Sequence, residues 1–152
     1  MKHHLLLELK KLEGQVFTNT NSMAGKWLNY TLVSVESGIV EASIPVRPDM
    51  TNPNGMLHGG MISMISDELC GLAFYSLGYP TYYTTVNLII DYLYSAPVHT
   101  TVIAKANVIR SGKRIANIEC VIYDAENRII SRATSNLVNT DKEVFKLSIS
   151  NS

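Results

Sequence analysis

The sequence has few cysteines, no long apolar run and no excess of either charge. Cys70 and Cys120 are the only two cysteines among 152 residues, too few for a disulfide framework, so we expect a reducing, cytoplasmic setting. No apolar stretch approaches the roughly 20 residues that a membrane-spanning helix requires. The 13 basic residues balance the 13 acidic ones, which gives no long-range attraction toward nucleic acid or an anionic membrane.

The sequence also lacks the patterns that bind metals and nucleotides. A glycine-rich loop of the nucleotide-triphosphate type is missing. The histidines have no second ligand at a useful spacing, which applies to His3, His4, His58 and His99. We therefore expect no metal and no cofactor. What the chain does have is an apolar content of 46%, which is enough for the core of one domain.

The beginning of the chain predicts a short amphipathic helix over residues 3–12. Its leucine run ends at Glu8 and no small-residue cleavage site follows, so we do not expect a signal peptide. A polar break follows, in which Ser22 is a candidate helix cap. We expect three parts of the chain: an N-terminal helical segment, one folded domain and a C-terminal tail that is partly disordered, at residues 1–24, 25–140 and 141–152.

Six further segments predict strands, and one predicts a long helix. Residues 59–77 are apolar around most of a helical wheel, which is typical of a helix buried on most sides. Glycine at 78 and proline at 80 end it in the expected order. Alternating or β-branched patterns predict strands over residues 27–36, 39–46, 82–94, 100–110, 114–123 and 128–139. The turns at 110–114 and 124–128 have the length and composition of hairpins.

The order of these elements predicts the fold class. No helix separates the last four strands, so their sheet should be antiparallel and strongly curved. A curved sheet that wraps one apolar helix buries that helix on most sides. We therefore expect an α+β fold with a single long central helix.

The stretch "NPNGMLHGGMISMISDELCG" at 52–71 resembles the signature of the hotdog-fold acyl-CoA thioesterases, in particular the PaaI-like branch. That family pattern is Asn, two residues, Gly, two residues, His-Gly-Gly, six residues and an acidic residue, and every spacing fits. The order of elements from about residue 25 to 139 is also similar. The matching positions are Asn52, Gly55, His58, Gly59, Gly60 and Asp67. The resemblance implies a hotdog fold and hydrolysis of an acyl-CoA.

Gly59 and Gly60 lie where the long helix should begin. Helix N-termini carry backbone N–H groups without partners and a partial positive charge, and glycine lets a carbonyl oxygen come close. The resemblance implies that the Gly59 amide polarises the thioester carbonyl as an oxyanion donor and that Gly60 contacts the substrate. The alternative is that both glycines only permit a tight entry into the helix.

His58 and Asn52 each have two readings. His58 either braces the helix start or, as the resemblance implies, helps to position the thioester. Asn52 is either a turn former before Pro53 or, by the resemblance, a polar contact to the acyl carbonyl or the attacking water. Asn54 competes with it at the wrong spacing.

Asp67 is the central candidate. A carboxylate in an apolar helix costs free energy unless it is paired or faces a polar cavity, so its alternative role is a salt bridge at a dimer seam. The resemblance implies a general base, or a nucleophile that forms a mixed anhydride. Glu68 projects about 100° away around the helix, so we expect it at a subunit interface or the surface and outside the cavity of Asp67.

The remaining candidates come from the later strands and the helix. The resemblance implies that Thr85 orients the water in the site of the neighbouring subunit, with Thr84 beside it; the alternative is ordinary strand threonines. The cations near the turn at 110–114, with Arg132 on the last strand, are candidate ligands for the CoA phosphates. They are Arg110, Lys113 and Arg114. We expect Cys70 to pack in the core, because a thiol nucleophile would need a base nearby and His58 lies more than two turns away.

The resemblance implies a homodimer with composite sites at the ends of a helix seam, assembled as a dimer of dimers, and a small-molecule acyl-CoA as substrate. Two alternatives stay open. A hotdog hydratase or dehydratase pairs an Asp with a His five residues on, whereas Asp67 follows His58 by nine. A non-catalytic acyl-CoA sensor of the transcriptional kind needs an N-terminal DNA-binding domain, for which about 25 residues are too few. The acyl group itself is not specified by the sequence.

Overall fold

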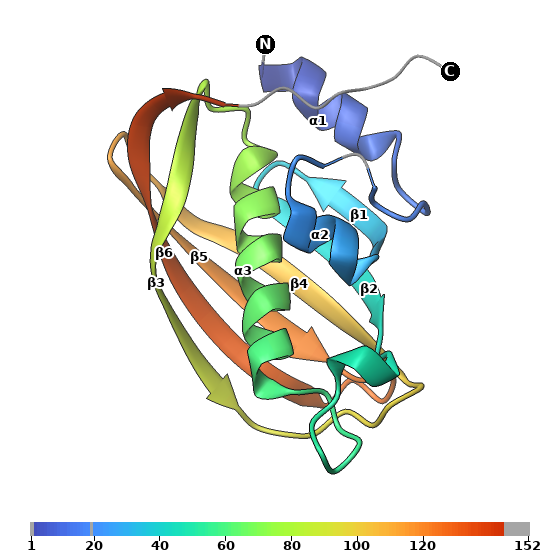
Figure 1. The fold of residues 1–152 in the computed structure, drawn as a ribbon. Helices are drawn as coiled ribbons and strands as arrows, with labels where there is room; N and C mark the ends of the chain where they lie inside the picture. The colour runs from blue at the N-terminus through green and yellow to red at the C-terminus, as the bar shows by residue number, and fades with distance from the viewer. Residues whose placement is uncertain (1, 19, 145–152) are drawn as a thin grey trace.

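One long helix packs against a six-stranded antiparallel sheet, as the sequence predicts (Figure 1). The computed structural model describes residues 2–18 and 20–144, with the side chains of residues 2 and 3 left out of the description. The elements in chain order are α1 (Lys2–Lys10), α2 (Met23–Leu28), β1 (Thr31–Glu36), β2 (Ile39–Pro45), a 3-10 turn (Pro48–Met50), α3 (Gly59–Tyr75), β3 (Thr81–Tyr92), β4 (Thr101–Ser111), β5 (Ile115–Tyr123) and β6 (Ile129–Glu143). In these ranges no helix is long and apolar enough to cross a membrane.

The strands follow the order β1-β2-β4-β5-β6-β3, so β1 and β3 form the two edges of the sheet. Every neighbouring pair is antiparallel, and β4–β5 and β5–β6 are hairpins. Alternate residues of the inner strands are fully buried, as their patterns predict, and they face α3, which packs against β2 to β6. Among them are Val40, Ala42, Ile44, Ala104, Ala106, Ala116, Ile118, Cys120 and Ile122. The core therefore lies between the concave face of the sheet and α3.

The α3 helix forms because residues 59–75 contain no proline and are mostly apolar, so that the sheet can bury them. His58 is its N-cap, and His58 Nδ1 accepts a hydrogen bond of 2.8 Å from the Gly60 N–H. At the other end Ser76 Oγ donates to the Ala73 carbonyl (2.7 Å) and accepts from the Gly38 N–H (2.9 Å). Gly78 then takes a positive φ of 69°, which glycine adopts without strain. Both ends of α3 are thus tied to the fold.

The segment before β1 differs from the sequence prediction. Residues 27 and 28 were expected in a strand, but they complete helix α2, and the strand starts only at Thr31. Ser22 caps α2 by accepting from the Gly25 N–H at 3.0 Å, which favours a helical turn over the β propensity of the aromatic Trp27. The αL residue Asn29 ends the helix and lets the chain turn into β1. The predicted cap is confirmed, and α1 packs on β1 at the edge of the sheet.

The last strand is longer than the sequence suggests. Residues 140–143 were assigned to a patternless tail, yet β6 continues to Glu143 and pairs with Thr81 of β3. Thr140 Oγ1 also donates to the Tyr82 carbonyl at 2.8 Å. Backbone pairing needs no hydrophobic alternation, so the pattern gave no signal. Residues 145–152 lie outside the described residues.

Candidate functional site

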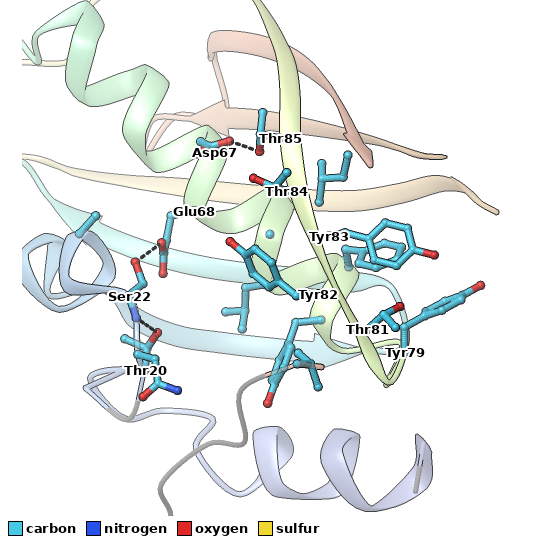
Figure 2. A pocket seen from close by; sticks show the side chains of 18 of the residues that line it. Thr20, Ser22, Asp67, Glu68, Tyr79, Thr81, Tyr82, Tyr83, Thr84 and Thr85 are labelled. Carbon is cyan, nitrogen blue, oxygen red and sulfur yellow. Dashed lines mark hydrogen bonds between the residues drawn. The ribbon is translucent and has the colours of Figure 1, made fainter. Parts of the chain in front are cut away.

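Asp67 projects from the middle of α3 toward the edge strand β3. The Thr85 hydroxyl of the same chain donates to Asp67 Oδ1 at 2.7 Å (Figure 2). The resemblance implies that Thr85 reaches the site of a neighbouring subunit; in the single chain it contacts its own Asp67, because β3 passes alongside α3 at that level. The carboxylate is exposed in the single chain. Asp67 therefore presents an oriented carboxylate whose second oxygen accepts no hydrogen bond from the described residues.

Asp67 borders a cavity of about 970 Å³. Three parts of the chain provide most of its lining: the segment that leads into α2, the second half of α3 and the first residues of β3 (Figure 2). We call the first of these the N-terminal wall, which consists of Thr20, Asn21, Ser22 and Ala24. Phe74, Tyr79 and Tyr83 pack together on the opposite side, with ring centroids 4.2–5.7 Å apart. Thr84 lines the cavity beside Thr85.

Glu68 lies on the same cavity as Asp67, against the sequence prediction that it faces elsewhere. The 100° turn between the two residues is real, but the cavity extends around α3 from β3 to the N-terminal wall. Glu68 Oε2 accepts from Ser22 Oγ at 2.8 Å, and Oε1 accepts from the Tyr30 hydroxyl at 3.4 Å. Burial raises the pKa of Glu68, and these two hydrogen bonds oppose that shift. Glu68 is therefore half-buried, lines the cavity, and is held there by residues of the same chain.

The start of α3 holds a second group of predicted residues. His58 Nδ1 is occupied by the Gly60 N–H, which agrees with the reading of His58 as a brace for the helix. The Gly59 N–H has no acceptor among the residues that the structure describes. It thus has the free donor that an oxyanion site requires. Gly60 has its N–H committed to His58, so its own part in substrate contact stays a prediction.

Two residues near Gly59 were missed by the sequence reasoning. The Tyr92 hydroxyl lies 3.0 Å from Ser63 Oγ and donates to the Gly59 carbonyl at 3.3 Å. A Cβ at Gly59 would meet the Tyr92 ring at 3.4 Å. Ser63 stands one helical turn after Gly59, a spacing that predicts proximity, but Tyr92 is 33 residues away in sequence. Only the pairing of β3 with the sheet places it there.

Asn52 has the geometry of a turn former. Its Oδ1 accepts from the backbone N–H groups of Asn54 (3.0 Å) and Met56 (3.2 Å). This interaction fixes the side chain and leaves its amide NH₂ group as a donor. The structure therefore supports the turn reading and is compatible with the contact that the resemblance implies. Asn54 itself is exposed.

Within one chain these two groups are separate. Gly59 and Asp67 are eight residues apart on one helix, which corresponds to about 12 Å along its axis. Asp67 and Thr85 lie near the middle of α3, whereas Asn52, His58 and Gly59 lie at or before its start. A thioester carbonyl cannot contact both groups of the same chain at once.

The predicted phosphate ligands lie outside the cavity lining: Arg110 lies at the end of β4, Lys113 and Arg114 form the turn to β5, and Arg132 lies on β6. Arg114 forms an exposed ion pair with Asp141 at 3.0 Å. Arg110, Lys113 and Arg132 are exposed and have no ion pair with another described residue. The turn is fixed to β3 because the Tyr83 hydroxyl donates to the Gly112 and Lys113 carbonyls.

The two cysteines lie in the core. Both thiols are fully buried, and the Cys120 thiol together with burial raises the pKa of Cys70 far above that of an ordinary thiol. The core role predicted for Cys70 is confirmed. In residues 2–18 and 20–144, no three histidine, cysteine or acidic side chains are grouped in a way that would hold a metal ion.

This chain is similar to known proteins of one superfamily. The family model described as "Thioesterase superfamily" matches residues 54–131. A protein of Thermoplasma acidophilum named as an esterase is 24% identical over 107 residues, which is 70% of this chain and 80% of that protein. Human acyl-coenzyme A thioesterase 13 is 29% identical over 86 residues, covering 57% of this chain and 61% of that protein.

The fold has a solved counterpart. The PaaI protein of the phenylacetic acid degradation operon of E. coli superposes with a TM-score of 0.81 over 95% of this chain and 100% of that chain, at 17% identity. The matched family region includes the helix start, Asp67, Thr85 and the turn at 110–114. On this evidence the chain belongs to the thioesterase superfamily and is a thioester hydrolase with the hotdog fold.

Proposed function

We propose that this protein hydrolyses acyl-CoA thioesters with Asp67 as its catalytic carboxylate. The single observation that carries the proposal is the Asp67–Thr85 pair, which holds one carboxylate oxygen and leaves the other open on a large cavity. In this family setting the thioester carbon would lie at the mouth of that cavity. A carboxylate held by one hydrogen bond is ready to accept a proton from water.

The reaction balances with one water molecule. Asp67 takes a proton as the water oxygen bonds to the carbonyl carbon, and the carbonyl π electrons move to oxygen. Collapse of the tetrahedral intermediate breaks the carbon–sulfur bond, and the electron pair leaves on sulfur. The proton on Asp67 passes to the thiolate, which gives CoA and the free acid. The nucleophilic route through a mixed anhydride uses the same carboxylate and consumes the same water in its second step.

We further propose that the oxyanion donor comes from a second copy of the chain. Within one helix about 12 Å separate the Gly59 amide from Asp67. If two α3 helices lie antiparallel, the Gly59 amide of one copy lies next to Asp67 of the other. The exposed apolar residues on the edge strand β3, Val86, Ile89 and Tyr92, support a homodimer along that edge. By this proposal His58 and Asn52 act with the partner copy's Asp67 and Thr85. Two such dimers would form the tetramer.

The CoA moiety needs cations for its phosphates. We propose Arg110, Lys113 and Arg114, because they are exposed at the end of β4 and on the turn that follows it. Arg114 already pairs with Asp141, so Arg110 and Lys113 should contribute more. Replacing both with alanine should raise KM for acyl-CoA with little change in kcat.

Asp67→Asn tests the central proposal. A general base contributes about 10²–10⁴-fold, so kcat on the best substrate of an acyl-CoA panel should fall by at least about 100-fold. A variant that retains the activity of the wild type would remove Asp67 from the mechanism. A wild-type protein that hydrolyses no member of the panel would refute the acyl-CoA thioesterase function itself.

Subunit complementation tests the composite site. Gly59→Pro removes the free N–H, and proline is favoured at the first helical position, where Gly59 lies after the extended His58. Gly59→Ala keeps the N–H and is the matched control. Inactive Asp67→Asn and inactive Gly59→Pro chains, unfolded and refolded together, would form mixed dimers with one intact site each. Random pairing would restore about a quarter of the wild-type activity; no recovery in verified mixed dimers would place the whole site in one chain.

A further inference from the structure

The cavity beside Asp67 contains two acidic side chains and no basic one among its described lining residues. Asp67 lies at the edge next to β3, and Glu68 points from α3 toward the N-terminal wall (Figure 2). The rest of the lining consists of apolar, hydroxyl and amide groups. Such a cavity accepts neutral groups, whereas a negatively charged group of the ligand would be repelled by these carboxylates at short range.

Glu68 is held in this position by three separate features. Ser22 Oγ donates to Glu68 Oε2 while it accepts from the Gly25 N–H, so the helix cap and the carboxylate share one hydroxyl. The Tyr30 hydroxyl donates to Oε1 from the start of β1. Gly25 leaves the necessary space, because a Cβ there would overlap Glu68 Oε1. The carboxylate is therefore a fixed part of the cavity wall.

Resting on the proposed function, we propose that this cavity takes the acyl chain of the substrate, and that Glu68 is a specificity-determining residue which excludes acyl chains that end in a carboxylate. The substrate class is then a neutral acyl group. The thioester lies at Asp67, the chain extends between the N-terminal wall and β3, and the CoA part lies outside. A terminal carboxylate on the acyl chain would enter a space in which no described lining residue is a cation.

The competing explanation is that Glu68 only clamps α2 to α3. Pentanoyl-CoA and glutaryl-CoA separate the two roles. Their acyl chains have the same length, but the first ends in a methyl group and the second in a carboxylate. Glu68→Gln removes the charge, keeps the size and still accepts from Ser22. Ser22→Ala removes the clamping hydrogen bond and keeps the charge. Glu126→Gln removes one charge at the exposed β5–β6 turn, outside the cavity.

The measurement is the ratio of kcat/KM for pentanoyl-CoA to that for glutaryl-CoA. Burial raises the pKa of Glu68, and the groups that face its carboxylate are Ser22, Tyr30 and Asp67, so the assays are run at about pH 8, on the alkaline side of the ordinary carboxyl range. We expect the wild type to prefer pentanoyl-CoA by roughly 100-fold. Glu68→Gln should reduce this ratio at least about tenfold, mainly through KM for glutaryl-CoA, while Glu126→Gln should keep the wild-type ratio.

Two results would overturn the proposal. Equal ratios for wild type and Glu68→Gln, with pentanoyl-CoA hydrolysed normally, would show that Glu68 does not select the acyl chain, and the thioesterase function would stand. If Ser22→Ala and Glu68→Gln reduce the ratio of kcat/KM values equally, Glu68 only holds α2 against α3. Glu68→Asp, which keeps the charge, should retain the discrimination; it serves as the second test if Glu68→Gln does not fold. A wild type with no activity on any acyl-CoA would overturn both proposals together.

Discussion

Gly25→Ala is expected to destabilise this protein, although the same change in a helix is normally stabilising. Alanine is favoured over glycine in a helix interior by about 0.8–1.0 kcal/mol, and Gly25 lies inside α2 without a positive φ. The new methyl group, however, would overlap Glu68 Oε1 and lie 2.9 Å from Glu68 Cδ. The carboxylate must move away, and it then loses the hydrogen bond from Ser22.

The size of the effect follows from these two contributions. A hydrogen bond to a charged group contributes about 1.5–3 kcal/mol. Replacing glycine by alanine in a helix stabilises it by up to about 1 kcal/mol, which offsets part of that loss. We therefore expect the free energy of unfolding to fall by roughly 0.5–2 kcal/mol, a difference between two estimated ranges. For a chain of this length the melting temperature changes by about 2–4 °C per kcal/mol. Urea denaturation and thermal melts monitored by circular dichroism would measure both quantities.

The decisive comparison is made in the Glu68→Ala background. Without the carboxylate, the methyl group at position 25 has room, and Gly25→Ala should become neutral or stabilising by up to about 1 kcal/mol. Gly71→Ala is the matched control, because a Cβ at Gly71 meets no atom within 4 Å, so it should stabilise in both backgrounds. If Gly25→Ala destabilises equally with and without Glu68, the contact between α2 and Glu68 is not the cause and the reasoning is refuted.

Three further predictions concern single side chains. Thr85→Val removes the hydroxyl that holds Asp67 and should lower kcat by about 10- to 100-fold. Thr85→Ser keeps a hydroxyl and should keep most of the wild-type kcat. An equal decrease of kcat in both variants would argue against a role for the hydrogen bond. Ser66 Oγ is buried with no hydrogen-bond partner in the described chain, so Ser66→Ala should leave the melting temperature unchanged or raise it, and a clear decrease would reveal a partner. Burial raises the pKa of Glu68 above the ordinary 4.5, so the folded state binds this proton more tightly than the unfolded state and wild-type stability should decrease as pH rises from about 4.5 through the raised pKa. Glu68→Gln should lack this contribution, and parallel stability curves against pH for the two proteins would contradict it.

Several features of the protein were determined by the sequence alone. The 17-residue helix α3 was predictable because its apolar residues cover most of a helical wheel and its ends carry local stop signals. The burial of alternate residues in β2, β4 and β5 follows from the period of two in a strand. The candidate residues near the start of α3, and Asp67 itself, were predictable because the motif that contains them is contiguous. Short-range patterns specify these features, so they need no knowledge of the rest of the chain.

Only the tertiary structure decided where the charged groups of the site lie. The sequence gives the 100° angle between Asp67 and Glu68, but it does not give the width of the cavity that receives both. Glu68 meets Ser22 and Tyr30, which are 46 and 38 residues away, and Thr85 meets Asp67 only because edge strand β3 runs beside α3. These contacts depend on how separate elements pack, and a carboxylate's environment is the sum of such long-range neighbours. The sequence therefore identified the acidic pair, and the packing of α2 and β3 around α3 assigned each carboxylate its partners.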